Sequence, residues 1–255
     1  MRTAFRLPKI SITAILPAAA CLLSLTFMCA CGEIRTAADC LISGNQYFAS
    51  KDYEHAASEY REALKRDPQS STALNNLGVV LNELGKYDEA AQILKQAVEH
   101  DPKNQIARYA LARSLTHLKK YDEAIEHASK AVELDPQELP AHRALAEALF
   151  ASGDMQAAID EYRVIAKADG DDDQAHQFLG EALMKKGDTD GALTELKRAV
   201  ELKPDNSDAR KAYAEALNGK GEREAAIAQL DEALKQKPDD ASLKELRSSY
   251  ESAAK

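Results

Sequence analysis

The chain has 255 residues, of which 45% are hydrophobic and 5% aromatic, and its formal net charge is −9. This length allows one or two domains or one long array, and the hydrophobic fraction is typical of a folded protein. Because nucleic-acid binding needs a basic surface, the acidic balance argues against a nucleic-acid partner.

Residues 1–30 have the layout of an export signal. A basic start is followed by an uncharged run from Ile10 to Ala30. This order of a positive start, an apolar stretch and small residues predicts a signal peptide. The run also approaches the ~20 residues that span a bilayer, so an uncleaved membrane anchor is the alternative. The basic residues are Arg2, Arg6 and Lys9.

The end of this run, Met28-Cys29-Ala30-Cys31-Gly32, resembles the lipobox of bacterial lipoproteins. The resemblance implies that Cys31 is lipidated and that 31–36 is a short tether, because several acyl chains on one Cys anchor a protein durably. It also implies a lipid-anchored protein of the bacterial cell envelope. Gly32 rather than Asp after the Cys favours the outer membrane, facing the periplasm.

Other interpretations of the cysteines stay open. Cys21 is a competing lipidation candidate, and Cys29 and Cys31 are ordinary small residues if the segment is a plain signal or anchor. If Cys21 and Cys29 leave with the signal and Cys31 is lipidated, Cys40 is left without an intramolecular partner. It falls on the inward stripe of a predicted helix, so we expect a buried, inert thiol.

A period of 34 residues runs through the rest of the chain. Pro recurs at this spacing, with Gly170 in one place, and we number this column position 32 of the unit. Position 8 is then Gly or Ala, position 20 is always Ala, and position 15 is Gly in four of six units. The units are 37–70, 71–104, 105–138, 139–172, 173–206 and 207–240.

These columns resemble the tetratricopeptide repeat (TPR). The resemblance implies an all-α, right-handed solenoid of six TPR helix pairs, each with a helix A and a helix B. Gly at position 15 permits the left-handed backbone that ends helix A. Small residues at positions 8 and 20 let the two helices approach closely, and Pro at position 32 ends helix B.

Two parts of the array differ from the other units. Unit 4 lacks its Pro and carries Ile165 at position 27, where the other units have Ala, so we expect looser packing onto unit 5. After the sixth unit, 241–255 keeps Leu243, Leu246 and Tyr250 on one helical face. This pattern predicts a capping helix that covers the last unit.

The sequence contains no recognisable catalytic constellation, and we predict a protein that is not an enzyme and has no cofactor or metal. His142 and His176 share position 4 of neighbouring units, but helices that pack side by side lie ~10 Å apart, too far for one metal ion. We expect both to be packing residues. The acidic cluster 169–173 lacks the spacing of a calcium loop, so we expect helix capping there.

The resemblance implies that positions 2, 5, 9, 12 and 13 of the A helices face a concave groove. An extended or helical protein segment is the expected ligand, and a solvated helix face is the alternative for each residue. The predicted groove residues are Asn45, Phe48, Asn75, Val79, Asn82, Tyr109, Arg113, Arg143, Glu147, Phe150, Glu181 and Met184, with Leu41, Lys185, Lys211 and Glu215 beside them.

Some TPR domains clamp the C-terminal carboxylates of chaperones with Asn and cationic residues. Asn45 and Asn76 match the Asn positions, but Leu41, Ile106 and Ala110 take the cationic ones. Without cations the carboxylates would be buried unpaired, which is unfavourable. We therefore expect a different ligand.

The leading functional hypothesis is a non-catalytic scaffold or adaptor of the bacterial cell envelope that binds a protein segment in this groove. The partner would belong to the envelope machinery. The architecture is also similar to the pilotin lipoproteins that assemble the secretin of type IV pili, which is one alternative. The other is a soluble exported adaptor subunit of a periplasmic enzyme complex.

Overall fold

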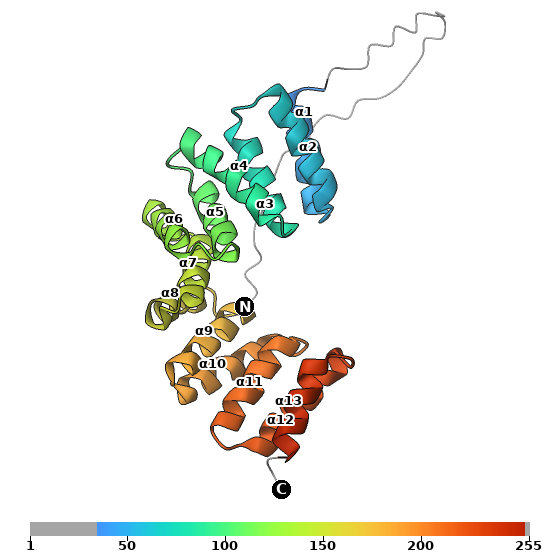
Figure 1. Cartoon of the computed structure of the whole chain (residues 1–255), viewed down its shortest axis with the longest axis vertical. Helices are drawn as coiled ribbons and strands as arrows, with labels where there is room; N and C mark the ends of the chain where they lie inside the picture. Colours follow the sequence, from blue (N-terminus) through green and yellow to red (C-terminus); the bar gives the residue numbers. More distant parts are fainter. Residues whose placement is uncertain (1–34, 253–255) are drawn as a thin grey trace, which may run out of the picture. The chain divides into compact units, whose positions relative to one another are not determined.

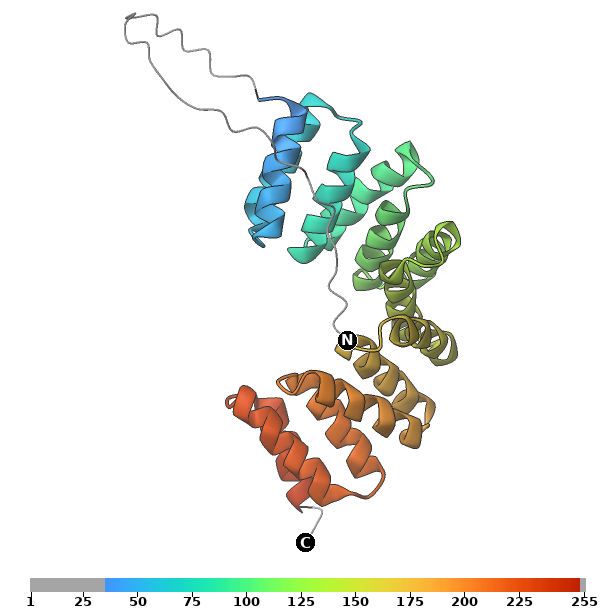
Figure 2. The same cartoon turned by 180° about the vertical axis from the view of Figure 1, so that it is seen from behind.

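The computed structural model describes residues 35–252, which form thirteen helices and no strand. Each helix packs against the next in chain order (Figures 1 and 2). This arrangement confirms the predicted all-α solenoid. The predicted signal peptide and the lipidation site Cys31 lie outside the described residues. Within the described part, no helix is both long and apolar enough to cross a membrane.

The helices alternate between A and B along the array. The A helices are α1 (Ala37–Ala49), α3 (Ser71–Glu83), α5 (Gln105–His117), α7 (Leu139–Ser152), α9 (Asp173–Lys186) and α11 (Ser207–Gly219). The B helices are α2 (Tyr53–Arg66), α4 (Tyr87–His100), α6 (Tyr121–Leu134), α8 (Met155–Ala168), α10 (Thr189–Leu202) and α12 (Arg223–Gln236). The last helix, α13 (Ala241–Ser252), packs on α12.

The turn from helix A to helix B has a left-handed residue at position 15 in every unit. Gly takes this conformation in four units, with φ between 71 and 98°, and needs no Cβ there. Units 1 and 3 have Lys51 and Lys119 instead, at φ 61 and 60°. A side chain in this region is strained, so these two turns cost more than their Gly counterparts.

The two helices of a unit cross at position 8, as the small residues predict. A Cβ on Gly44 would lie 2.5 Å from the ring of Tyr60, and one on Gly78 would lie 2.3 Å from Leu94. Contacts this short leave no room for a side chain. Tyr60 and Leu94 both occupy position 24, so a large residue there requires Gly at position 8 in these units.

Side chains at positions 24 and 27 of one unit, and position 6 of the next, lie where consecutive units meet. Between units 3 and 4 these residues are Ala128, Ala131 and Ala144, all buried, and α5 packs directly against α7. We call this contact the closed junction. Small side chains here let the A helices of neighbouring units meet.

Between units 4 and 5 the same three positions hold Tyr162, Ile165 and Phe178. The rings of Tyr162 and Phe178 stack with centroids 5.8 Å apart. Helices α8 and α9 pack closely, but α7 and α9 have at most a marginal direct contact. We call this contact the open junction. The looser packing predicted at Ile165 is therefore limited to the contact between α7 and α9 and does not extend to α8 and α9.

In units 3 to 6, the residue at position 4 ties the A helix to its neighbours. In unit 4 the Nδ1 atom of His142 lies 2.6 Å from Glu161 Oε2, and its Nε2 atom lies 3.1 Å from the carbonyl oxygen of Pro136. The side chain thus joins helix B to the preceding loop. Similar contacts join His176 to Glu195 and Gly170, Arg108 to His127 and Pro102, and Arg210 to Gln229 and Pro204.

Two other predictions about buried residues agree with the structure. Cys40 is fully buried on α1. On α13, Leu243 is buried against the last unit, and Leu246 and Tyr250 are partly buried beside it. The apolar face of α13 therefore covers the core of the sixth unit, which has no following unit.

Candidate functional site

The predicted groove residues divide into two groups along the A helices. On α1, α3 and α5, the predicted residues Asn45, Phe48, Val79 and Tyr109 line an apolar pocket, whereas those on α7, α9 and α11 are mostly charged. The two groups differ in what they can bind, because apolar surface favours large hydrophobic side chains and unpaired charge favours opposite charge.

The apolar pocket has a volume of about 400 Å³. Two large side chains beside it are unusually exposed, Ile106 at 46% and Phe48 at 38%. Exposed apolar clusters of this kind mark interaction sites more often than inert surface. The pocket is lined by Asn45, Phe48, Tyr60, Asn76, Val79, Ile106 and Tyr109.

Three polar groups lie in the wall of this pocket. The Tyr60 hydroxyl donates to Asn45 Oδ1 over 2.7 Å, and Asn76 Nδ2 donates to the same oxygen over 3.0 Å. These bonds fix the Asn45 amide, whose Nδ2 makes no hydrogen bond within the described residues. A fixed amide beside an apolar pocket is suited to a peptide main chain.

At the charged end, position 9 is Glu in three consecutive units: Glu147 on α7, Glu181 on α9 and Glu215 on α11. We call these residues the acidic row. Burial raises the pKa of Glu147 and of Glu181 above the usual Glu value. Within the described residues, neither Glu147 nor Glu215 makes a hydrogen bond or ion pair through its side chain, and Glu181 accepts only from Gln177 on its own helix, over 2.8 Å.

The cations near the acidic row are held by other partners. Arg143 pairs with Asp172, the N-cap residue of α9. The Lys185 ammonium lies 4.0 Å from the centroid of the Phe150 ring, a cation–π contact that joins α9 to α7. Arg143 keeps one buried donor, Nη1, without a partner.

Arg113, on α5, is held in the same way. Its Nη1 atom lies 3.3 Å from Glu83 Oε1, so this ion pair joins α5 to α3. Each predicted groove cation on α5 and α7 therefore has an acidic partner on another element, whereas the acidic row has no ion-pair partner in the described part of the chain.

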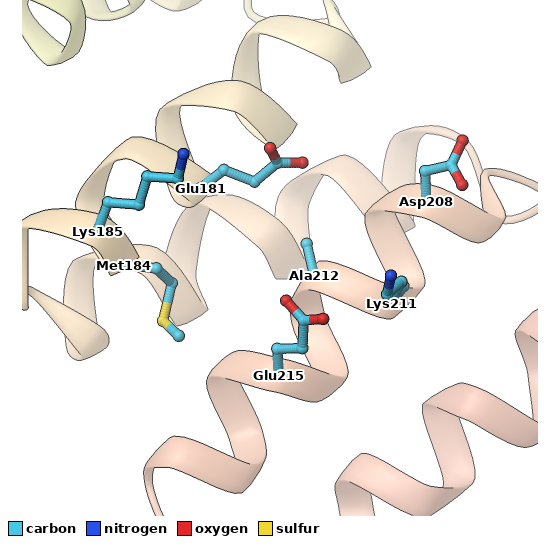
Figure 3. Close-up of a pocket in the computed structure, with 7 residues that line it drawn as sticks. All are labelled: Glu181, Met184, Lys185, Asp208, Lys211, Ala212 and Glu215. Atoms are coloured by element: carbon cyan, nitrogen blue, oxygen red, sulfur yellow. The ribbon is translucent and has the colours of Figure 1, made fainter. Parts of the chain in front are cut away.

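A second pocket, of about 340 Å³, lies between α9 and α11 (Figure 3). Met184 and Ala212 supply its apolar surface, and Glu181 and Glu215 lie on the two helices that flank it. The other lining residues are Lys185, Asp208 and Lys211. Asp208 is paired with Lys237 at 3.1 Å.

Asn75 and Asn82 differ from the prediction that they face the groove, because they are only 8% and 4% exposed. Asn82 Nδ2 donates to the carbonyl of Ala110 over 2.8 Å, and the Ser114 hydroxyl donates to Asn82 Oδ1 over 2.6 Å. Asn82 therefore binds α3 to α5. Polar residues at groove positions are buried wherever the next A helix packs over them.

Three pocket residues were not among the predicted groove residues: Tyr60, Asn76 and Ile106. Tyr60 lies on a B helix at position 24, where the residue is buried in all six units. The size of Tyr60 was the one signal that it lines the pocket. A Tyr at position 24 reaches past the A helix, whereas the Leu of other units only contacts it. Asn76 and Ile106 lie at the positions compared with the carboxylate clamp.

Among residues 35–252, no group of three or more His, Cys, Asp or Glu side chains could hold a metal ion. The cluster at 169–173 contributes caps instead: Asp172 accepts from the backbone N–H of Ala175 over 2.9 Å at the start of α9. The predicted capping role is therefore present at this residue.

Comparisons with known proteins agree with the repeat. Family models described as the tetratricopeptide repeat match residues 43–104, 83–138, 115–182 and 183–250. A comparison with curated proteins found no match.

Solved structures of TPR proteins are similar to the chain. The Cut9–Hcn1 hetero-tetramer of the APC/C matches with a TM-score of 0.77 at 19% identity, over 86% of this chain and 43% of that one. TTC0263, a thermophilic TPR protein of Thermus thermophilus, matches with a TM-score of 0.59 at 28% identity, over 71% of this chain and 98% of that one.

YrrB, a TPR protein with an unusual peptide-binding site, matches with a TM-score of 0.59 at 20% identity, over 75% of this chain and 99% of that one. Likeness at this identity shows the fold alone. Because the family models match well over half of its residues, this chain belongs to the tetratricopeptide-repeat family.

Proposed function

We propose that this protein is a non-catalytic scaffold of the bacterial cell envelope that holds a segment of a partner protein against its A helices. TPR arrays are typically binding modules, and the peptide-binding site named for YrrB is one example in a protein of similar fold. The observation that carries the proposal is the apolar pocket, where Phe48 and Ile106 leave large apolar surface exposed around an unfilled volume of about 400 Å³.

The apolar pocket supplies a place for a side chain of the partner, and the acidic row supplies charged groups on later A helices. An apolar side chain of the partner fills the pocket and removes the surface of Ile106 and Tyr109 from water, which stabilises the complex. The fixed amide of Asn45 and the buried donor of Arg143 meet main-chain groups. Specificity then comes from a few placed polar groups in a largely apolar groove.

The envelope location is supported by the sequence before the array. The lipobox-like segment ends at Cys31, and α1 begins at Ala37, with Thr36 as its N-cap. The five residues between the Cys and the helix span at most ~17 Å. A lipid on Cys31 would therefore hold the first unit near the bilayer, and a partner would have to reach it there.

Two measurements test the two halves of this proposal. For the anchor, the mass of the mature N-terminus and the membrane fractionation of a Cys31→Ser variant are expected to show a lipid on Cys31. An unmodified start beyond Cys31 would exclude the lipoprotein and favour the soluble exported adaptor.

For the groove, a photo-cross-linker at Ile106 is expected to trap a partner protein in cells, because this side chain lies at the pocket. The matched control places the same cross-linker at Lys95, an exposed residue of the B helix α4. Equal adducts from both positions, or none from Ile106, would show that the groove is not the binding surface.

A further inference from the structure

The acidic row has three carboxylates and no ion-pair partner among residues 35–252, and this imbalance points to the chemistry of the partner. Glu147, Glu181 and Glu215 repeat at one position of neighbouring A helices. Burial raises the pKa of the first two, so their ionised forms are poorly solvated. A desolvated carboxylate is stabilised strongly by a cation that can pair with it.

The unpaired hydroxyl of a buried tyrosine provides a second sign of a ligand at the same place. Tyr162 is 1% exposed, and its hydroxyl has no hydrogen-bond partner among the described residues. The pKa of Tyr162 is raised by burial and next by the charge of Glu147, with smaller effects of Arg143 and Glu181. Tyr162 lies at the open junction, where its ring stacks on Phe178 of α9.

The open junction separates the backbones of α7 and α9. Tyr162 and Phe178 stack between α8 and α9, and α7 and α9 have at most a marginal direct contact. Glu147 and Glu181 come from the two separated helices. At the same junction, Arg143 Nη1 is a buried donor without an acceptor. Buried donors are normally paired, because leaving one unpaired costs free energy.

We propose that the partner segment places an Arg or Lys side chain between Glu147 and Glu181, over the Tyr162 hydroxyl. This inference rests on the proposed function and specifies its partner. The guanidinium or ammonium donates to the two carboxylates and to the phenol oxygen, and a main-chain carbonyl of the segment accepts from Arg143 Nη1.

The third carboxylate of the row sets the spacing of the partner's cations. Neighbouring packed helices lie ~10 Å apart, and an extended segment in the polyproline II conformation rises about 3.1 Å per residue and presents every third side chain on the same face. Cations three residues apart in the segment would therefore meet Glu181 and Glu215 in turn. Met184 lies in the pocket between α9 and α11 (Figure 3). The segment is basic and extended, and one of the two residues between its cations contacts Met184.

The experiment compares two extended peptides of equal length with the full chain in detergent. One peptide has Arg at every third residue of a Ser/Val background, and the other has Glu in the same places. Fluorescence anisotropy is expected to show tight, salt-sensitive binding of the Arg peptide only. Replacing Glu147 and Glu181 by Gln is expected to weaken it at least about tenfold.

The matched control is the double variant Glu99→Gln and Glu126→Gln. These residues are exposed on the B helices α4 and α6, so the control removes the same net charge without touching the row. Equal loss in the control would reduce the effect to net charge and overturn the proposal. Binding of the Glu peptide, or no binding of the Arg peptide, would overturn it as well.

A failure of this inference can be distinguished from a failure of the proposed function. If the cross-linker at Ile106 traps a partner while the Arg peptide does not bind, the groove binds a protein and only the basic chemistry is wrong. If the cross-linker traps nothing and the Arg peptide binds the acidic row, the row is a site and the apolar pocket is not.

Discussion

The closed and open junctions use the same three positions of the same repeat, and they hold neighbouring A helices differently. Ala128, Ala131 and Ala144 let α5 and α7 pack directly. At the open junction, three large side chains take these places, and the backbones of α7 and α9 are kept apart while Lys185 and Phe150 still join the two helices. Side-chain volume beneath the groove therefore decides where neighbouring A helices meet and where polar groups between them remain accessible.

A second junction, between units 1 and 2, supports this relation. Tyr60, like Tyr162, occupies position 24, and α1 and α3 also have at most a marginal direct contact. Both tyrosines lie under candidate binding residues: Tyr60 lines the apolar pocket, and Tyr162 lies near Glu147 and Glu181. The two hydroxyls differ, because Tyr60 donates to Asn45 whereas Tyr162 has no such bond within the described residues.

The largest expected effect comes from emptying the open junction. We expect Tyr162→Ala to lower the free energy of unfolding by about 3–5 kcal/mol, because it removes a buried aromatic ring. Chemical denaturation followed by circular dichroism measures this. Tyr162→Phe is the control and should change stability by about 0.5 kcal/mol or less. A large loss in the Phe variant would mean that the hydroxyl has a structural bond.

Filling the closed junction should have the next largest effect. We expect Ala131→Ile, which copies Ile165, to lower the free energy of unfolding by about 1–3 kcal/mol, because it overpacks a site without free space. Spin labels on α5 and α7 should also move apart in pulsed electron resonance. An unchanged distance between the labels would contradict the link between volume at position 27 and helix spacing.

The turns of units 3 and 4, on either side of the closed junction, allow a smaller test. Lys119 has a positive φ of 60°, where unit 4 has Gly153. We expect Lys119→Gly to raise the free energy of unfolding by about 0.5–1 kcal/mol, because Gly relieves the strain of the left-handed backbone. Urea denaturation measures the gain. The reverse change, Gly153→Lys, should destabilise the protein.

The smallest expected effect concerns Glu147, on the helix between the two junctions. Burial raises the pKa of this carboxyl in the folded state, so stability is lost as pH rises from the ordinary Glu value through the folded one. We expect Glu147→Gln to raise the unfolding free energy by about 1 kcal/mol or less at neutral pH. The gain should vanish in acid. Thermal melts over pH test this, and a gain independent of pH would exclude ionisation as its cause.

Most of the fold could be predicted from the sequence because each unit repeats the same local constraints. Gly at position 15 predicts the end of helix A in four units, and small residues at positions 8 and 20 predict the crossing. What could not be predicted depends on neighbours across units. Asn82 occupies a groove position, yet Ser114 and the carbonyl of Ala110 on the next helix bury it. Tyr60 was not predicted to line the groove because it occupies a buried position of a B helix, yet its side chain forms part of the pocket wall.

The charged end shows the same limit. The pattern places Glu147 and Glu181 at position 9, but it does not show that Arg143 is already paired with Asp172 or that Lys185 lies on Phe150. These pairings depend on the separation of α7 and α9. That separation follows from Tyr162, Ile165 and Phe178, which lie beneath the groove. The predicted signal peptide and Cys31 lie outside the described residues and remain predictions.

Spacing and ligand contact depend on different layers of residues, and this separation affects how such an array can evolve. The residues that set the distance between A helices lie beneath the groove, and those that contact a ligand lie on top of it. Mutations in one layer can therefore widen or narrow a site without altering its chemistry, and mutations in the other can change the ligand without altering the spacing. A duplicated unit inherits both layers and is free to vary each one separately.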